Sequence, residues 1–250
     1  MESNVDDIKN MVRESYSGFI KEGSCCSSSG SCCGSTGNAK TISKSVGYSE
    51  DEMSAVPDSA NLGFGCGNPT AIASIKEGET VLDLGSGAGL DAFLSAQKVG
   101  PKGKVIGVDM TPDMITKAKK NAEEGKYQNV EFMLGEIENL PVDDCSIDVI
   151  ISNCVINLSP EKQKTFNEAY RVLKSGGRIM ISDLVLKKEL PKEIKESSQS
   201  YAACISGAVL IEEYLGFIKS AGFKDVKITK EAEYLDMKEY ILSISVLAVK

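Results

Sequence analysis

The sequence predicts an α/β protein built on a mostly parallel β-sheet with helices on its faces. Apolar runs alternate with helical segments from residue 80 onward, which is the pattern of βαβ units. The first run enters a helix through a glycine-rich turn at residues 85–89, and the second ends at Asp109. With 250 residues, 42% of them hydrophobic, the chain can bury a full core as one main domain with an appended arm.

The first 45 residues are expected to form a helix and an arm that precede the main domain. Apolar residues recur at helical spacing over residues 5–21, which predicts an amphipathic helix. Residues 23–37 contain only Gly, Ser, Thr and Cys, a composition that cannot bury enough apolar surface to order itself. We therefore expect residues 1–45 to be a helix with a flexible arm, and residues 46–250 to be the main domain. The arm carries four thiols, those of Cys25, Cys26, Cys32 and Cys33.

Within the main domain, local signals predict helices and strands in turn. Ser49 and Glu52 have capping-box spacing for a short helix that stops near Pro57. Helices are expected to start at Thr111–Pro112 and at Ser159–Glu161, and two more should occupy residues 192–204 and 209–221. Strands are expected at seven positions, namely residues 80–84, 105–109, 130–133, 147–152, 178–182, 226–229 and 244–249.

Composition argues against several classes of function. The net charge is −8 and no dense Lys/Arg cluster occurs, so a nucleic-acid partner is not expected. The chain has no histidine, which excludes Ser/His/Asp and Cys/His nucleophiles and histidine-bound zinc. No apolar run approaches the length of a membrane span, and the N-terminus is acidic and polar, so we expect a cytoplasmic protein without a membrane partner. Eight cysteines in such a protein favour thiols with a ligand or redox role over a disulfide framework.

The turn after the first strand has the composition of a cofactor site. Gly85, Gly87 and Gly89 allow a tight turn and a close approach of helix N-terminal amides to a ligand, and the carboxylate of Asp109 can accept ribose hydroxyls. A dinucleotide fingerprint requires its third glycine where this chain has Leu90. S-adenosylmethionine has no phosphate, and its positive charges suit Asp83. The pattern therefore favours S-adenosylmethionine; the alternative is that the glycines only turn the strand into the helix.

Four stretches resemble the class I S-adenosylmethionine-dependent methyltransferases over about residues 70–185: VLDLGSGAG, IGVDMT, GEIENLP and RVLKSGGRIMISD. The resemblance implies a Rossmann-like fold with a mostly parallel seven-stranded sheet. It also implies that Glu136 and Ile137 flank the adenine and that Asn153 lies beside the methionine part of the cofactor; Glu136 as an exposed loop acid is the alternative. The expected cofactor-binding residues are Asp83, Gly85, Gly87, Gly89, Asp109, Met110, Glu136, Ile137 and Asn153.

Three cysteines occur where a methyl acceptor could meet the cofactor. Cys66 lies in the loop before the glycine turn, Cys154 follows the fourth strand directly, and Cys204 lies in the C-terminal part. Ligands of open α/β sheets bind at the carboxyl ends of the strands, which brings Cys154 to the site. Three thiolates match the valence and softness of trivalent arsenic, whose free lone pair needs positioning but no general base. The alternative for each cysteine is a small buried hydrophobic residue, and Cys145 is interpreted as incidental.

The stretches NLGFGCGNP, SNCVINLSPEK and CISGA, together with YSEDEM and VPDSAN, resemble the arsenite methyltransferase family over nearly the whole chain. This resemblance implies that Cys66, Cys154 and Cys204 bind As(III) and that S-adenosylmethionine methylates arsenite to methylated arsenicals. It implies a thiol reductant such as glutathione or thioredoxin. It also implies an upstream cysteine that pairs with Cys66, and the candidates for this redox partner are Cys25, Cys26, Cys32 and Cys33.

Two other functions stay open at this point. A methyltransferase for an organic small molecule, such as a quinone or lipid precursor, would keep its activity without Cys154. A thiol-based metalloid-binding protein would use the arm cysteines as ligands and would not bind S-adenosylmethionine. The number of methyl groups added and the oligomeric state cannot be predicted from the sequence.

Overall fold

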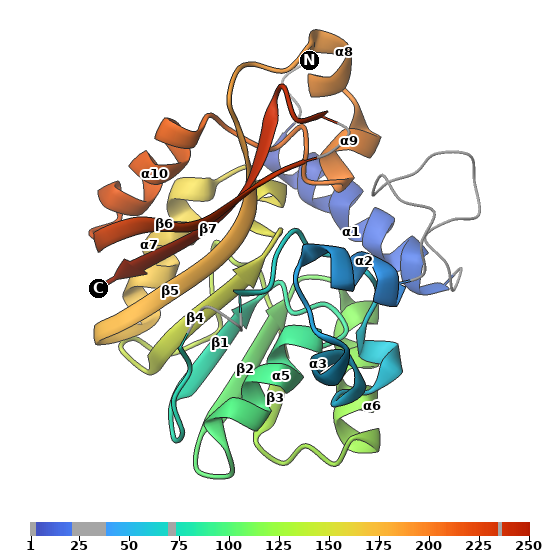
Figure 1. Cartoon of the computed structure of the whole chain (residues 1–250), viewed down its shortest axis with the longest axis vertical. Coiled ribbons are helices and arrows are strands. Elements are labelled where there is room, and N and C mark those ends of the chain that lie inside the picture. The colour runs from blue at the N-terminus through green and yellow to red at the C-terminus, as the bar shows by residue number, and fades with distance from the viewer. Residues whose placement is uncertain (1–3, 22–38, 70–73, 235–236) are drawn as a thin grey trace.

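A seven-stranded sheet forms the centre of the computed structural model, which describes residues 4–21, 39–69, 74–234 and 237–250 (Figure 1). The strand order is β3-β2-β1-β4-β5-β7-β6. The first five strands pair in parallel, and β7 runs antiparallel to both β5 and β6. The strands are β1 (Thr80–Leu84), β2 (Lys104–Asp109), β3 (Val130–Leu134), β4 (Ile147–Asn153), β5 (Leu173–Leu186), β6 (Lys224–Glu233) and β7 (Ile241–Val249). The mostly parallel seven-stranded sheet predicted from the sequence is confirmed.

Helices cover both faces of the sheet, because the central strands alternate their side chains between two apolar clusters. Leu82 of β1 packs in the cluster that contains Phe166 and Tyr214, whereas its neighbour Val81 packs in the cluster that contains Phe93. Burial on both faces is typical of a parallel sheet. The helices are α1 (Val5–Lys21), α2 (Ala39–Val46), α3 (Glu50–Ser54), α5 (Leu90–Val99), α6 (Pro112–Glu124), α7 (Lys162–Val172), α8 (Lys192–Lys195), α9 (Ser198–Ala202) and α10 (Ile211–Ser220).

Local signals set several helix starts as expected. The hydroxyl of Ser49 accepts the N–H of Glu52 at 3.1 Å, and the Glu52 carboxylate accepts the N–H of Ser49 at 2.9 Å, so α3 begins in a capping box. Helix α6 begins at Pro112 after Thr111, as predicted. The N–H of Thr111 donates to the Asp109 carboxylate at 2.8 Å, which ties the end of β2 to this helix start.

Several elements differ from the sequence prediction. Helix α7 begins at Lys162, after Ser159–Glu161, because the Ser159 hydroxyl accepts the N–H of Glu161 and donates to Glu138, which closes a turn instead. The helix expected over residues 192–204 is two short helices, and Ser197 caps the second by accepting the N–H of Ser200. Strands β5 and β7 extend beyond their predicted ends because they pair continuously from Arg178↔Val249 to Leu186↔Ile241.

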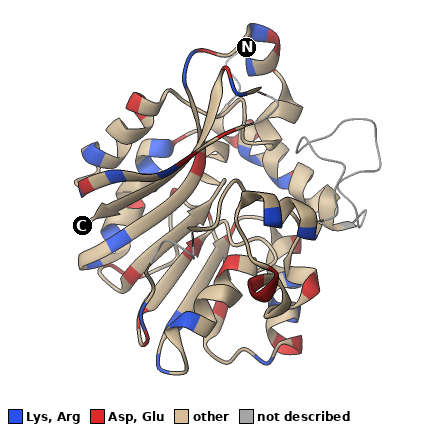
Figure 2. Ribbon diagram, viewed as in Figure 1, with Lys and Arg blue, Asp and Glu red and all other residues tan. Residues whose placement is uncertain are grey.

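The N-terminal helix packs onto the main domain. Helix α1 contacts α6 and α9, and its residue Val12 is buried. The Cys-containing segment 23–37 lies outside the described residues, so the four arm cysteines and the boundary expected at residue 45 remain predictions. Within the described part of the chain, no helix has both the length and the hydropathy needed to cross a membrane. Figure 2 shows basic residues interspersed with acidic ones along the ribbon, in the view of Figure 1.

Packing between α7 and α10 yields a test of the core. The ring of Phe166 is fully buried and meets the ring of Tyr214 edge-on, with 5.6 Å between ring centroids. Phe166→Ala is expected to lower the free energy of unfolding by about 3–5 kcal/mol, because truncation of a buried aromatic ring leaves a cavity. Leu134→Ala, at a side chain that is 55% exposed, should change it by no more than about 0.5 kcal/mol. Urea denaturation followed by circular dichroism measures both, and equal losses in the two variants would contradict this packing.

Candidate active site

A cavity of about 390 Å³ opens at the carboxyl ends of the parallel strands. Its walls come from the glycine turn after β1, the ends of β2 and β4, the loop around Cys66, helix α1 and the segment around Cys204. This is the edge where ligands of open α/β sheets bind, and the volume suits a cofactor-sized ligand. Residues far apart in the sequence thus line one space.

Two glycines of the turn leave room that a side chain would occupy. Gly85 has φ +66°, and a Cβ on it would lie 2.3 Å from Val155, so the backbone there must approach the segment after β4 closely. Gly87 has φ +52°, and no described atom lies within 4 Å of the position that its Cβ would take. Gly87 lines the cavity. The turn therefore presents bare backbone to the cavity at Gly87, while Gly85 allows the close approach to Val155; the contact of both glycines with a cofactor remains a prediction.

Acidic groups surround this turn. The Asp109 carboxylate accepts the N–H of Gly87 at 3.0 Å and that of Thr111 at 2.8 Å, which fixes it at the end of β2. Asp83 is buried, and its Oδ2 atom has no hydrogen-bond partner among the described residues. Burial, followed by the charges of Asp91 and Asp109, raises the pKa of Asp83 well above its usual range. A ligand that brings positive charge and hydroxyl groups would satisfy these acceptors.

A polar cluster beside the cavity, which the sequence predicted only in part, consists of Tyr48, Asp91 and Asn153. The Tyr48 hydroxyl contacts both Asp91 carboxylate oxygens at 2.7 and 2.9 Å and accepts a hydrogen bond from the Asn153 amide at 2.8 Å. Burial raises the pKa of Asp91 to about 6, although the hydrogen bonds from Tyr48 and Asn153 oppose the shift. Only Asn153 was predicted as a site residue. Tyr48 lies more than 40 positions before its partner Asp91 in the chain, so no local pattern links the two.

The residues expected around the adenine divide into two kinds. Ile137 lines the cavity, as does Met110, which was predicted to bind the cofactor; their contacts with a cofactor remain predictions. The Glu136 carboxylate instead pairs with Lys9 of α1 at 2.8 Å and with Arg13 at 3.5 Å. Its expected contact with the adenine therefore remains a prediction.

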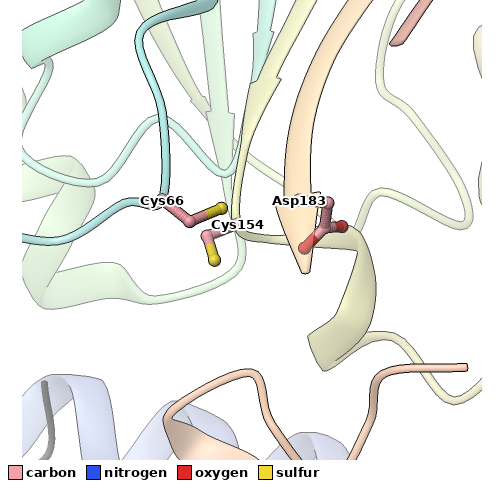
Figure 3. Close-up of side chains that lie close together, drawn as sticks. All are labelled: Cys66, Cys154 and Asp183. Carbon is pink, nitrogen blue, oxygen red and sulfur yellow. The ribbon is translucent and has the colours of Figure 1, made fainter. Parts of the chain in front are cut away.

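Two of the three predicted thiols meet a carboxylate at the cavity wall. The sulfur atoms of Cys66 and Cys154 and one oxygen of Asp183 all lie within 4.8 Å of one another. Figure 3 shows Cys66 on its loop and Cys154 after β4, with Asp183 on β5 beside them. Asp183 was not predicted as a site residue, because an acid within a buried strand is distinguished from a structural acid only once the pairing of β4 with β5 brings it beside Cys154.

Cys204 joins the same group through its neighbour. Its thiol donates to the backbone carbonyl of Cys154 at 2.7 Å, and all three cysteines line the cavity. Cys154 and Cys204 both have positive φ, +59° and +63°, a left-handed conformation that costs about 1–2 kcal/mol for a residue other than glycine. The local fold therefore holds the backbone at both cysteines in a strained conformation. Cys145 is exposed and does not line this cavity, in line with its interpretation as incidental.

The thiols are held in their neutral form. Burial raises the pKa of Cys66. A hydrogen bond with Cys154, followed by burial, raises the pKa of Cys204 well above its usual range. The pKa of Cys154 is also raised: its hydrogen bond with Cys204 favours the thiolate, but the hydrogen bond with Cys66 and burial outweigh it. Burial likewise raises the pKa of Asp183 to about 7, although the Leu184 N–H and the Tyr214 hydroxyl both donate to its carboxylate.

Comparison with known proteins identifies relatives along most of the chain. A methyltransferase-domain family model matches residues 75–233. The arsenite methyltransferase of Halobacterium salinarum is 45% identical over 98% of this chain and 67% of its own length, and the human arsenite methyltransferase is 40% identical over 64% of this chain and 44% of its own. A crystal structure of the arsenic(III) S-adenosylmethionine methyltransferase of Chlamydomonas reinhardtii superposes with a TM-score of 0.67 and 32% identity, covering 86% of this chain and 75% of that one. This chain thus spans two thirds of the haloarchaeal relative and less than half of the human one.

The polar group around Asp91 can be tested directly. Tyr48→Phe is expected to raise the pKa of Asp91 above its value of about 6, because the hydroxyl that stabilises the charged carboxylate is lost. Titration of the Asp91 carboxyl carbon by NMR measures this shift. Tyr127→Phe is the matched control, since the Tyr127 hydroxyl lies 3.3 Å from the Ala55 carbonyl instead. An Asp91 midpoint that stays unchanged in Tyr48→Phe would show that the hydroxyl does not stabilise the carboxylate.

Proposed function

The chain belongs to the arsenite methyltransferase family of S-adenosylmethionine-dependent methyltransferases, and on this basis we propose that it transfers methyl groups from S-adenosylmethionine to trivalent arsenic held by Cys66, Cys154 and Cys204. The observation that carries this proposal is that these thiols and the glycine turn line one cavity. An in-line methyl transfer requires the donor and the acceptor to meet within one cavity.

We propose that the donor lies along the glycine turn. When bound, S-adenosylmethionine supplies an electrophilic methyl group on a positively charged sulfur. The bare backbone at Gly87 leaves it space, the Asp109 carboxylate accepts ribose hydroxyls, and Asp83 and Asp91 offset its positive charges. The proposed donor site comprises Asp83, Gly85, Gly87, Gly89, Asp109, Met110, Glu136, Ile137 and Asn153, to which we add Asp91.

Neutral thiols suit arsenite as the acceptor. Arsenite at neutral pH is the uncharged hydroxide, so each cysteine exchanges its S–H for an As–S bond while the hydroxide and the thiol proton leave together as water. No free thiolate is required beforehand, which agrees with the raised pKa values of all three cysteines. Three As–S bonds leave one lone pair on arsenic, which can attack the methyl group of a donor bound in the same cavity. Val12 and Tyr16 of helix α1 also line this cavity.

The redox balance requires a reductant. The arsenic lone pair becomes an As–C bond when the methyl group arrives, so the formal oxidation state of arsenic rises by two. Its return to the trivalent state takes two electrons, which two thiols supply when they form a disulfide. We propose that glutathione or thioredoxin reduces the enzyme again, and that one of Cys25, Cys26, Cys32 or Cys33 pairs with Cys66.

The decisive measurement is mass-spectrometric detection of methylated arsenic after the reduced protein is incubated with arsenite and S-adenosylmethionine. Wild type should form product. Cys154→Ser and Cys204→Ser should lose activity by more than the roughly 10- to 100-fold that loss of a supporting contact costs at a metal site. Cys145→Ser, at an exposed thiol outside the cavity, should retain full activity. A wild-type protein that binds the donor but forms no methylated arsenic would refute the proposal and point to an organic acceptor.

Donor affinity should depend on pH through Asp91. The pKa of this carboxyl is about 6, so it is neutral at pH 5 and charged at pH 7, whereas the amino group of S-adenosylhomocysteine stays positive throughout. Affinity for S-adenosylhomocysteine, measured by isothermal titration calorimetry, should therefore rise with pH by up to about tenfold per unit below pH 6 and level off above it. Asp91→Asn should bind more weakly at pH 8 and lose most of this slope. Glu123→Gln, at an exposed acid on α6, should keep it; an unchanged slope in Asp91→Asn would rule out this role.

A further inference from the structure

We infer that the side chain of Asn153 couples the donor half of the cavity to the acceptor half, so that the methyl donor and trivalent arsenic strengthen each other's binding. The inference rests on the proposed function for the identity of the two ligands. It concerns a property that neither site has alone, namely how occupation of one changes the affinity of the other. The contacts of Asn153 on its two sides make it a positioning residue for Cys66.

On the acceptor side, the Asn153 amide holds the backbone of the loop that carries Cys66. Its Oδ1 accepts the N–H of Cys66 at 3.0 Å, and its Nδ2 donates to the carbonyl of Gly67 at 2.8 Å. The loop can approach this closely because residue 65 is glycine: a Cβ there would lie 2.7 Å from Asn153 Nδ2. The two ends of one amide therefore fix the backbone on both sides of the Cys66 Cα, and with it the direction of the thiol.

On the donor side, the same Nδ2 atom contacts the Tyr48 hydroxyl at 2.8 Å and the Asp91 carboxylate at 3.3 Å. Asp91 lies in the first turn of α5, the helix that follows the glycine turn, and is one of the residues that line the cavity. Asn153 is thus the side chain that touches both the Cys66 loop and the acid proposed to meet the donor's amino group.

The direction of coupling follows from a count of protons. An amide NH₂ has two protons, but Asn153 Nδ2 faces three acceptors, namely the Tyr48 hydroxyl, the Gly67 carbonyl and the Asp91 carboxylate. The longest of the three contacts is the one to Asp91. When a cationic amino group occupies the Asp91 carboxylate, both amide protons become available to Tyr48 and Gly67. The loop is then held more firmly and Cys66 is set for arsenic, so the coupling is positive.

A second anchor of Cys66 provides a matched control. The Ser243 hydroxyl of β7 donates to the Cys66 carbonyl at 2.6 Å. In the strand order, β7 is separated from β1 and its glycine turn by β4 and β5, and Ser243 approaches Cys66 from that side. Loss of Ser243 removes a hydrogen bond from the same residue without touching the link to Asp91.

The coupling is measured by isothermal titration calorimetry on the reduced full-length protein. Arsenite is titrated with and without saturating S-adenosylhomocysteine, and the analogue is titrated with and without arsenite; the two ratios of Kd values must agree. For wild type we expect arsenite to bind about 5- to 150-fold more tightly in the presence of the analogue, the usual range of such coupling. Asn153→Ala should reduce the ratio to near 1, whereas Ser243→Ala should weaken arsenite binding but keep the wild-type ratio.

Tyr48→Phe gives a second variant in case Asn153→Ala does not fold. It leaves the amide on the loop and removes the hydroxyl that joins Asn153 to Asp91, so the ratio should fall below that of wild type. A wild-type ratio of 1 with both ligands bound, or a wild-type ratio in Asn153→Ala, would overturn the inference and leave the proposed function standing. An equal loss of coupling in Ser243→Ala would also overturn it, because general loosening of the loop would then explain the effect. Failure of wild type to bind arsenite at all would instead refute the proposed function.

Discussion

The parallel register of β1 with β2 and β4 is the constraint on which the candidate site depends. Leu84 at the end of β1 pairs with Val108 on one side and with Ser152 on the other. One residue further along each strand come Gly85, Asp109 and Asn153, so the glycine turn, the carboxylate and the amide are brought to one edge. A slip of one residue in the pairing of β1 with β2 or with β4 would turn the side chain of Asp109 or of Asn153 to the opposite face of the sheet. The apolar clusters on both faces of the sheet hold this register, and the chemistry at its edge is a consequence.

Local sequence signals were sufficient to predict most of the helices and strands. They could not predict contacts between residues far apart in the chain. The glycine turn and the capping box at Ser49 depend on neighbouring residues, so composition and spacing predicted them, whereas the ends of β5 and β7 depend on their pairing with each other and were missed. The hydrogen bonds of Tyr48 to Asp91 and the approach of Asp183 to Cys66 join residues 43 and 117 positions apart, and they exist only once the sheet has formed. The start of α7 was missed for the same reason, because Ser159 donates to Glu138 of another loop.

Four buried acids give the cavity its electrostatic character. Burial raises the pKa values of Asp83, Asp91, Asp109 and Asp183, and the pKa values of the three cysteine thiols are raised as well. Such groups are costly to bury without a cation. The charge of Lys98 offsets part of this cost at Asp91, and that of Lys162 offsets part of it at Asp183. A positively charged ligand would compensate the acids further, so its binding should stabilise the fold.

Lys9 of helix α1 pairs with a group of acidic residues on the main domain. Lys9 lies 2.8 Å from Glu136, 3.4 Å from Glu138 and 3.8 Å from Glu161, and its side chain is only 9% exposed. The same helix contributes Val12, Tyr16 and Phe19 to the cavity, so these ion pairs help to position one wall of the ligand site. Charges shielded from solvent are little affected by dissolved ions. The pair of Lys9 with Glu138, whose side chain is only 6% exposed, should therefore keep this wall in place at salt concentrations that weaken exposed ion pairs.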